Sequence, residues 1–427
     1  MKTLLLLLFP LLLTAQPTPV IYSFRTDGEG GLARLAADPA TGALLTHERL
    51  FQEPGAAAIR KVYLSQDGRW AAANLDGIED FNNLLVFDLT DGGRPRYLSI
   101  PGEVDPVGFF HNRIYAGSKS GALHRIHPET LAIEATWNFR RQLTPSGRRP
   151  EDLFLDAEAN ILWVSFQKDS RNQRHRGSRI VGISLETDEI ISDLQLPRDR
   201  PELHYAPEVD GREAGPNPEV LHISPATNTL FVTLDLYGAV GMADLDAARR
   251  GELVNWTVLS TAPDGSWGTA FPDRVGRFQL AGRELLVVAN ASAAGGVAFI
   301  DVARRSILQQ VNSPGGLSTL FFLPSLNMVI SGSPGKNKAR TETGLSNVSV
   351  ALPTWNRFQL TPDGTFALRS DDLGQAVNQA FPVSPANSPW VFLNLGENAD
   401  HWQIIHPDTL QVTETFPAFG TLQRFGL

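Results

Sequence analysis

Asp38-Pro39-Ala40-Thr41-Gly42-Ala43-Leu44 decides the fold, because close copies of this stretch return along the chain. His127-Pro128-Glu129-Thr130-Leu131 and His406-Pro407-Asp408-Thr409-Leu410 repeat it, and looser copies begin at Leu185 and Phe299. Each copy lies between two short apolar runs rich in β-forming residues. Proline fixes φ, Asp or Glu bonds its own backbone, and Thr and Gly complete a tight reversal. The stretch is therefore predicted to be the turn between two adjacent strands.

The spacing of this turn predicts a repeat architecture. A turn that recurs about every 40 to 60 residues between strands is the signature of a propeller or a solenoid. No sustained helical periodicity is found, and no Pro- or Ser-rich linker divides the chain. At 427 residues the chain exceeds what one ordinary core holds, but propeller blades pack only on their neighbours. We predict an all-β fold, a β-propeller of four-stranded blades.

The two ends of the chain are predicted to complete one blade together. The strands expected between Val20 and Phe51 lack an inner strand, and Gly420-Thr421-Leu422-Gln423-Arg424-Phe425 has the pattern of one. A ring closed by strands from both termini leaves no exposed edge. Seven units can be assigned up to Ser331, and residues 332–389 are either a long insertion in the seventh blade or part of an eighth. We expect seven blades, with eight as the alternative.

The first residues have the pattern of a signal peptide. Lys2 precedes the apolar run Leu4 to Leu13, and Thr14-Ala15-Gln16 offers cleavage after Ala15. The run is too short to span a bilayer comfortably. We expect residues 1–15 to be removed and residues 16–427 to form one domain, secreted or periplasmic, with no transmembrane segment. An uncleaved anchor is the alternative.

Composition excludes several function classes. The formal net charge of −9 disfavours binding to nucleic acid. The chain has no Cys, which removes disulfides, a cysteine nucleophile and the Cys-x-x-Cys-His attachment of a redox propeller. Neither Gly-x-Ser-x-Gly nor His-Glu-x-x-His occurs, so standard hydrolase and zinc-protease motifs are absent. We expect no cofactor.

The residues also carry a resemblance to a family. The opening Val20-Ile21-Tyr22-Ser23-Phe24, with Gly30-Gly31-Leu32 and the turn at Asp38, resembles the opening of YncE-like and lactonase-type propellers, which are related to 6-phosphogluconolactonase and built from YVTN-like repeats. Ser65-Gln66-Asp67-Gly68 and Thr361-Pro362-Asp363-Gly364 are similar to the inner-strand turns of that superfamily. The resemblance implies a propeller, and either a sugar-lactone hydrolase or an exported binding protein. It covers turn residues, so it identifies no catalytic residue.

Basic loops indicate where a ligand binds. Propellers bind ligands on one face, at the loops from outer to next inner strands and from second to third strands. Two basic loops are expected there on the fourth blade, and they suit an acidic or carbohydrate ligand. A solvated loop without function is the alternative. The candidate ligand-binding residues are Arg140, Arg141, Arg148, Arg149, Lys168, Arg171, Arg174, His175, Arg176 and Tyr205.

The segment from Pro197 to Pro218 supplies candidates for catalysis. It is longer than loops usually are without a function. His204 and Glu208 are the material for general acid–base catalysis of lactone hydrolysis. A lid or a disordered insertion is the alternative.

A weak metal candidate lies nearer the amino terminus. Asp76, Glu79 and Asp80 gather oxygen donors, but their spacing is not that of an EF-hand loop. No metal is expected. We expect an exported protein that binds a small anionic or carbohydrate ligand, or an extracytoplasmic protein partner. The alternative function is a lactonase-like hydrolase.

Overall fold

The computed structural model describes most of the chain after Val20. The described residues are 20–26, 29–53, 59–75, 78–90, 94–143, 149–168, 175–200, 203, 215–280, 282–292, 295–317, 319–333, 336–341, 344–349, 354–384, 388–395, 401–417 and 421–425. The signal peptide predicted at residues 1–15 lies outside them. Within them, no helix has the length and apolar character needed to cross a bilayer.

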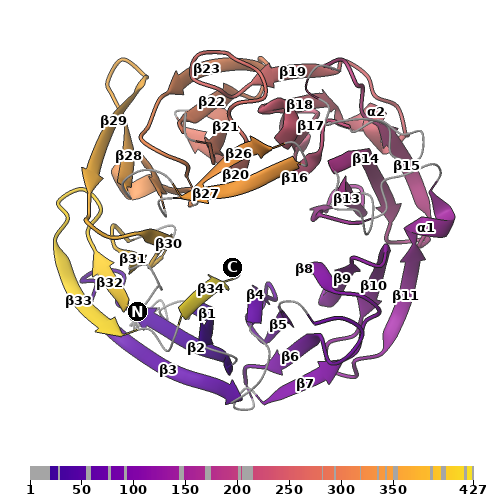
Figure 1. Ribbon diagram of the computed structural model, residues 1–427, viewed down its shortest axis with the longest axis horizontal. Helices are drawn as coiled ribbons and strands as arrows, with labels where there is room; N and C mark the ends of the chain where they lie inside the picture. The colour runs from indigo at the N-terminus through magenta and orange to yellow at the C-terminus, as the bar shows by residue number, and fades with distance from the viewer. Residues whose placement is uncertain are drawn as a thin grey trace, which may run out of the picture.

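The described strands form antiparallel sheets arranged as a ring (Figure 1). Blades 1 to 4 contain the strands β34 (Thr421–Phe425), β1 (Val20–Thr26), β2 (Glu29–Ala37), β3 (Leu44–Glu53); β4 (Ile59–Leu64), β5 (Trp70–Leu75), β6 (Leu84–Asp88), β7 (Pro95–Leu98); β8 (Val104–Phe110), β9 (Arg113–Ser118), β10 (Ala122–Ile126), β11 (Ile133–Asn138); β12 (Asp152–Asp156), β13 (Ile161–Lys168), β14 (His175–Ser184) and β15 (Ile190–Gln195).

Blades 5 to 8 continue in the same order from inner to outer strand. They contain β16 (Pro218–Ser224), β17 (Thr229–Leu234), β18 (Ala239–Asp244), β19 (Thr257–Ser260); β20 (Pro272–Leu280), β21 (Arg283–Asn290), β22 (Val297–Asp301), β23 (Ser306–Val311); β24 (Phe321–Leu323), β25 (Met328–Gly332), β28 (Thr354–Leu360), β29 (Phe366–Asp372); β30 (Val377–Pro382), β31 (Val391–Leu395), β32 (His401–Ile405) and β33 (Val412–Pro417). Short helices connect some strands: α1 (Phe139–Gln142), η2 (Pro225–Thr227), η3 (Asp235–Tyr237), α2 (Leu245–Arg249) and η4 (Pro324–Leu326).

The fold class is confirmed: the chain is a β-propeller of four-stranded blades. Closure by both termini is also confirmed, because β34 pairs with β1 and is the inner strand of blade 1. Counted over the described residues, the structure has eight four-stranded sheets, which is the alternative count rather than the expected seven.

Residues 332–389 account for this difference. The hairpin of β26 (Lys336–Thr341) and β27 (Gly344–Ser349) is inserted between the second and third strands of blade 7. β28 and β29 then complete blade 7, and β30 begins blade 8. The segment therefore holds an inserted hairpin, half of one blade and the first strand of the next.

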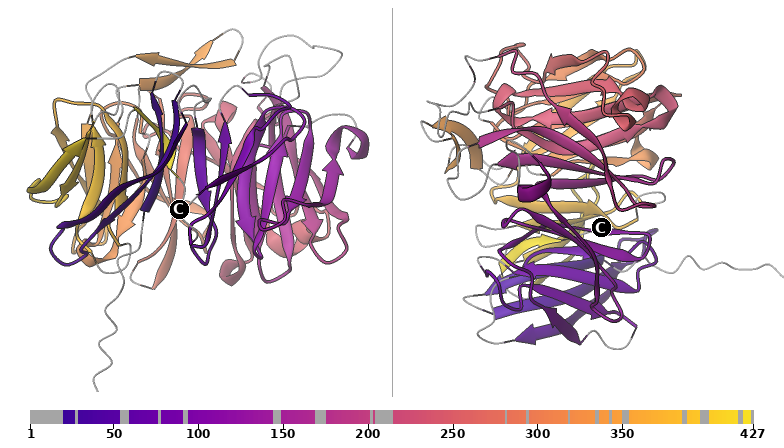
Figure 2. Two further views of the ribbon diagram at one scale, coloured as in Figure 1. Left: turned by 90° about the horizontal axis from the view of Figure 1, so that it is seen from below. Right: turned by 90° about the vertical axis from the view of Figure 1, so that its right-hand side faces the viewer.

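Because the strands alternate in direction, the connections fall on two faces of the ring. We call turn face the side with the connections from inner to second and from third to outer strands. We call loop face the side with the connections from second to third strands and from outer to next inner strands. Figure 2 shows the β26–β27 hairpin projecting from the loop face.

The recurrent turn lies on the turn face, between the third and outer strands. In the copies that begin at Asp38, His127 and His406, and in the looser copy predicted from Leu185, whose turn begins one residue earlier at Ser184, the N–H of the fifth residue donates to the carbonyl of the first, at 2.8–2.9 Å. The fifth residues, Gly42, Leu131, Asp188 and Leu410, all have φ between 58° and 71°. One backbone geometry therefore recurs even where a leucine must take a conformation that favours glycine.

Neighbouring blades hold these turns by hydrogen bonds. Arg96 of blade 2 donates to the carbonyls of Pro128 and Glu129 in blade 3. The indole of Trp390 in blade 8 donates to the carbonyl of Ala40 in blade 1, at 3.2 Å. The turn is thus also the contact through which one blade fixes the next.

The apolar core lies between adjacent blades. One cluster joins blades 8 and 1 through Trp390, Phe392, Trp402, Ala33 and Leu35. Another joins blades 3 and 4 around Trp137 and Val164. Since each cluster spans a blade boundary, the ring is stabilised by the packing of neighbours rather than by one central core.

Candidate functional site

The crossing from blade 3 to blade 4 places basic residues on the loop face. α1 follows the outer strand β11 directly and begins with Phe139, which is buried. The ring of Phe139 meets that of Phe166 near the end of β13, edge to face with centroids 4.9 Å apart. This contact holds Arg140 and Arg141 of α1 next to the point where β13 ends.

The two basic loops of the sequence therefore belong to one region of the loop face. The backbone of Lys168 pairs with that of His175, at the loop-face ends of β13 and β14. Only the backbone of Lys168, His175 and Arg176 is described. Arg148, Arg171 and Arg174 lie outside the described residues.

Arg140 and Arg149 each have a buried hydrogen-bond donor without an acceptor among the described residues, as Arg34 and Arg357 also do elsewhere in the ring. Arg140 is half-buried, and the side chain of Arg149 is 13 % exposed. The Nε of each guanidinium is buried and has no hydrogen-bond partner within the described chain. A buried donor without an acceptor costs roughly 1–3 kcal/mol, so both sites favour an added acceptor.

Arg149 also lies within a group of carboxylates. Its guanidinium is 3.8 Å from Asp105, on the inner strand β8 of blade 3, and 4.0 Å from Glu151, just before β12. These side chains are 15 % and 17 % exposed. The arginine bridges blades 3 and 4 near the axis of the ring, in a site that offers both cationic donors and anionic acceptors.

Asp152, the first residue of β12, is the titratable group of this region with a strongly raised pKa. Burial raises its pKa to about 6, against the opposing effects of the Leu221 N–H, which donates to it at 2.8 Å, and of Lys61. A carboxyl group with such a pKa exchanges a proton near neutral pH.

His222 lies farther along the same wall, on the inner strand β16. Its ring meets that of Phe154 with centroids 5.1 Å apart. Burial lowers its pKa to about 4, and the nearby Arg277 contributes. The imidazole is therefore neutral at pH 7. Sequence analysis did not identify Asp152 or His222, because no motif surrounds them and burial is the main cause of their shifted pKa values.

The predicted catalytic pair cannot be placed. His204, Glu208 and Tyr205 lie outside the described residues. The weak metal candidates are partly placed: Asp76 lies outside the description, and Glu79 and Asp80 are exposed. A carboxylate oxygen of Asp80 accepts the N–H of Gly102, which ties two loops together. Within the described chain, no group of three or more His, Asp or Glu side chains could hold a metal ion.

A collar of small polar residues supports the loop face. In blades 2 to 8, a buried Asn, Ser or Thr stands near the loop-face end of the second strand, at Asn74, Ser118, Ser165, Thr233, Asn290, Ser331 and Asn394. Most of them bond the backbone that enters an inner strand; Asn74, for example, donates to Val104 at 2.7 Å and Ser165 to Glu219 at 2.6 Å. The collar fixes the bases of the loops. Its signal in the sequence is one polar residue ending an apolar strand, once per blade.

Comparison with known proteins identifies the fold only. No protein-family model and no curated protein sequence matches the chain. Among solved structures, the dihydro-haem d1 dehydrogenase NirN in complex with DHE aligns with a TM-score of 0.66 at 10 % identity, covering 95 % of this chain and 74 % of NirN.

Two other solved structures align with lower TM-scores. The C-terminal WD40 domain of Sif2 has a TM-score of 0.54 at 9 % identity, covering 88 % of this chain and 89 % of that domain. The computationally designed protein Ika8 has a TM-score of 0.54 at 12 % identity, covering 90 % and 96 %. These likenesses show a β-propeller and, at such identities, nothing of its activity.

Proposed function

We propose that this protein is an exported β-propeller of the YncE-like and lactonase-type superfamily that binds a small acidic or carbohydrate ligand on the loop face of blades 3 and 4. The recurrent turn supports the family, and the residues of the signal peptide support export. The observation that carries the ligand site is the pair of buried guanidinium nitrogens, on Arg140 and Arg149, that lack hydrogen-bond acceptors.

The chemistry of the site suits a sugar acid. A planar guanidinium matches the two oxygens of a carboxylate, and the bond is strengthened by charge. Asp105 and Glu151 lie beside Arg149 and, when ionised, accept hydrogen bonds from hydroxyl groups. A ligand with one acidic group and several hydroxyls would use both sets of side chains.

Calorimetric titration of the mature chain with D-glucuronate and neutral D-glucose tests the proposal. We expect the double change Arg140→Gln and Arg149→Gln to weaken glucuronate binding at the loop face at least tenfold. Arg250→Gln is the matched control, since its side chain is 63 % exposed and lies on the turn face. Unchanged binding in the double variant would refute the site; no ligand binding at all would favour an extracytoplasmic protein partner.

A lactone hydrolase is the second candidate function, and Asp152 favours it. A carboxyl group with a pKa of about 6, on an inner strand beside Arg149 and Glu151, suits a general base for water attack on a lactone. Hydrolysis of glucono-1,5-lactone can be measured by the protons that it releases. We expect the Asp152→Asn variant to lose this hydrolysis and to retain ligand binding. Turnover equal to that of the unmodified chain would exclude this role.

A further inference from the structure

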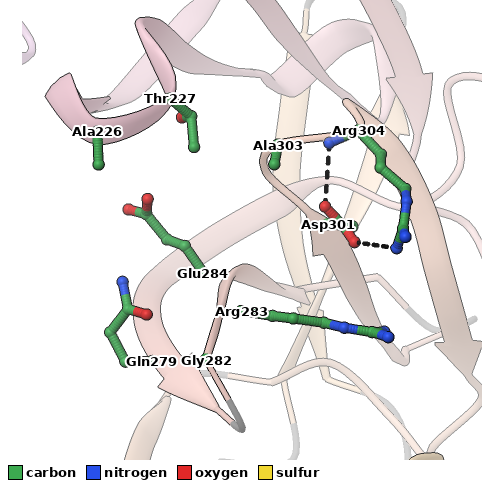
Figure 3. Close-up of a pocket in the computed structure, with 9 residues that line it drawn as sticks. All are labelled: Ala226, Thr227, Gln279, Gly282, Arg283, Glu284, Asp301, Ala303 and Arg304. Atoms are coloured by element: carbon green, nitrogen blue, oxygen red, sulfur yellow. Dashed lines mark hydrogen bonds and ion pairs between the residues drawn. The ribbon is translucent and has the colours of Figure 1, made fainter.

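A second site lies on the opposite side of the ring, on the turn face between blades 5 and 6. The structure has there a pocket of about 370 Å³, shown in Figure 3. This is near the lower end of the range for small-molecule sites, about 300–1,000 Å³. Its polar side chains are Thr227, Gln279, Arg283, Glu284, Asp301 and Arg304.

Two carboxylates of this pocket are buried and held in place. The side chain of Glu284 is 7 % exposed, forms an ion pair with Arg277, whose Nε lies 3.2 Å from Oε1, and accepts a hydrogen bond from the Ser224 hydroxyl at 2.5 Å. The side chain of Asp301 is 6 % exposed and accepts from the backbone N–H and the guanidinium of Arg304, at 3.0 and 2.9 Å. An ionised carboxylate has about four acceptor positions, so each retains about two for a ligand.

Among the described residues, the pocket contains two ion pairs and one further charged group, which is a cation. Glu284 is neutralised by Arg277, and Asp301 by Arg304. Arg283 is exposed and lines the pocket, and its guanidinium forms no ion pair with another described residue. In Figure 3 Arg283 extends beneath Asp301, whereas the Glu284 carboxylate points toward Ala226 on the other side of the pocket. Acceptors and a cation are thus presented on different parts of the wall.

We propose that this pocket binds a monosaccharide-sized sugar acid, that is, a polyhydroxylated molecule with one negative charge. Ligand hydroxyls donate to Glu284 and Asp301, and the ligand carboxylate pairs with Arg283. The amide of Gln279 lies beside the Glu284 carboxylate in Figure 3 and supplies a further polar contact. The inference is independent of the loop-face site, since the two share no residue and lie on opposite faces.

Calorimetric titration with three probes tests the chemistry. D-Glucuronate carries hydroxyls and a charge, D-glucose lacks the charge, and hexanoate lacks the hydroxyls. We expect glucuronate to bind at least tenfold more tightly than either of the others. Two results would overturn the proposal. One is that hexanoate binds as tightly as glucuronate. The other is that glucuronate does not bind at about 10 mM, roughly tenfold above the upper end, about 1 mM, of the range for ordinary metabolite sites.

Variants then locate the binding. Arg283→Gln and Gln279→Ala, each made in the chain that already carries Arg140→Gln and Arg149→Gln, should weaken the remaining glucuronate binding several-fold, and neither removes a buried side chain. Arg250→Gln, on the same face but outside the pocket, should leave it unchanged. The double change of Arg140 and Arg149 to Gln should also leave pocket binding intact. If that double variant alone abolishes all binding, sugar acids bind only the loop face and the pocket proposal is wrong.

Discussion

The two faces of the ring are built by different rules. On the turn face, short turns of one geometry repeat, and the adjacent blade bonds their carbonyls, as Arg357 of blade 7 does with Pro407 and Asp408 of blade 8. On the loop face, the connections differ from blade to blade, and the collar residues fix only their bases, as Asn290 does with Thr261. Repetition therefore belongs to the face that holds neighbouring blades together.

The difference teaches where variation is tolerated. A change in a recurrent turn alters both a reversal and a contact between blades. A change beyond the collar alters a loop whose attachment is unaffected, so ligand-binding residues can differ there without loss of the ring. The blade 5–6 pocket is an exception, because it places ligand-binding groups on the turn face. The three predictions below test this division, from the largest expected effect to the smallest.

The largest loss of stability is expected from Arg357→Met on the turn face. The guanidinium is 1 % exposed, pairs with Asp371 and donates to the carbonyl of Pro407 at 3.0 Å. Removing one partner of a buried ion pair costs about 3–5 kcal/mol. Urea unfolding should show a loss of that size. Arg369→Ala is the control, because its side chain is 64 % exposed and should change stability by less than about 0.5 kcal/mol. Equal effects would mean that the bonds across the blade boundary do not stabilise the ring.

A smaller loss is expected from Asn83→Ala, which removes a support of the loop face. The amide of Asn83 donates to the carbonyls of Ile100 and Gly102 and accepts the Ile100 N–H, at 2.7–2.8 Å. Leaving buried backbone groups unpaired should lower the free energy of unfolding by about 1–3 kcal/mol. Exposed Gln411→Ala should change it by less than about 0.5 kcal/mol. A loss as large as that of Arg357→Met would remove the distinction between the faces.

The Asp152→Asn change should have the smallest effect, which is to stabilise the folded chain by an amount that depends on pH. The pKa of Asp152 is about 6 in the folded chain and near 3.8 when unfolded, so the folded state binds more protons between these values. Ionisation therefore destabilises the folded state as pH rises from about 4 to 6. Asn still accepts the Leu221 N–H but has no charge. The variant should match the unmodified chain near pH 4 and melt at a higher temperature at pH 7.

His222 acts in the opposite direction, so the comparison must be made between variant and parent at each pH. Its folded pKa of about 4 is below the unfolded value of 6.5, and its contribution to stability is lost as pH falls through that range. The effect of His222 on stability is the same in the variant and in the parent chain, so it cancels when their melting temperatures are subtracted at each pH. A difference in melting temperature that is constant from pH 4 to pH 7 would contradict the raised pKa of Asp152.

Local chemistry allowed the sequence to predict much of the fold. The recurrent turn, the propeller and the closing strand near Thr421 follow from residues that fix φ or bond their own backbone, and such effects act within a few positions. The assignment of Thr361-Pro362-Asp363-Gly364 to an inner-strand turn was wrong, because it joins the third and outer strands of blade 7. Its bonds match those of the true inner-strand turn at Ser65, with the glycine N–H donating to the first carbonyl at 3.0 Å in both.

The same turn chemistry joins an inner to a second strand at Ser65 and a third to an outer strand at Thr361, so only packing in the ring fixes which strands a turn joins. Packing likewise decided that residues 332–389 hold an inserted hairpin and the start of an eighth blade. The sequence identified the arginines of blades 3 and 4 as ligand candidates because charge in a loop is visible locally. Only the tertiary structure brought Thr227, Glu284 and Asp301 into one pocket and raised the pKa of Asp152, because burial and contact between blades join residues far apart in the chain.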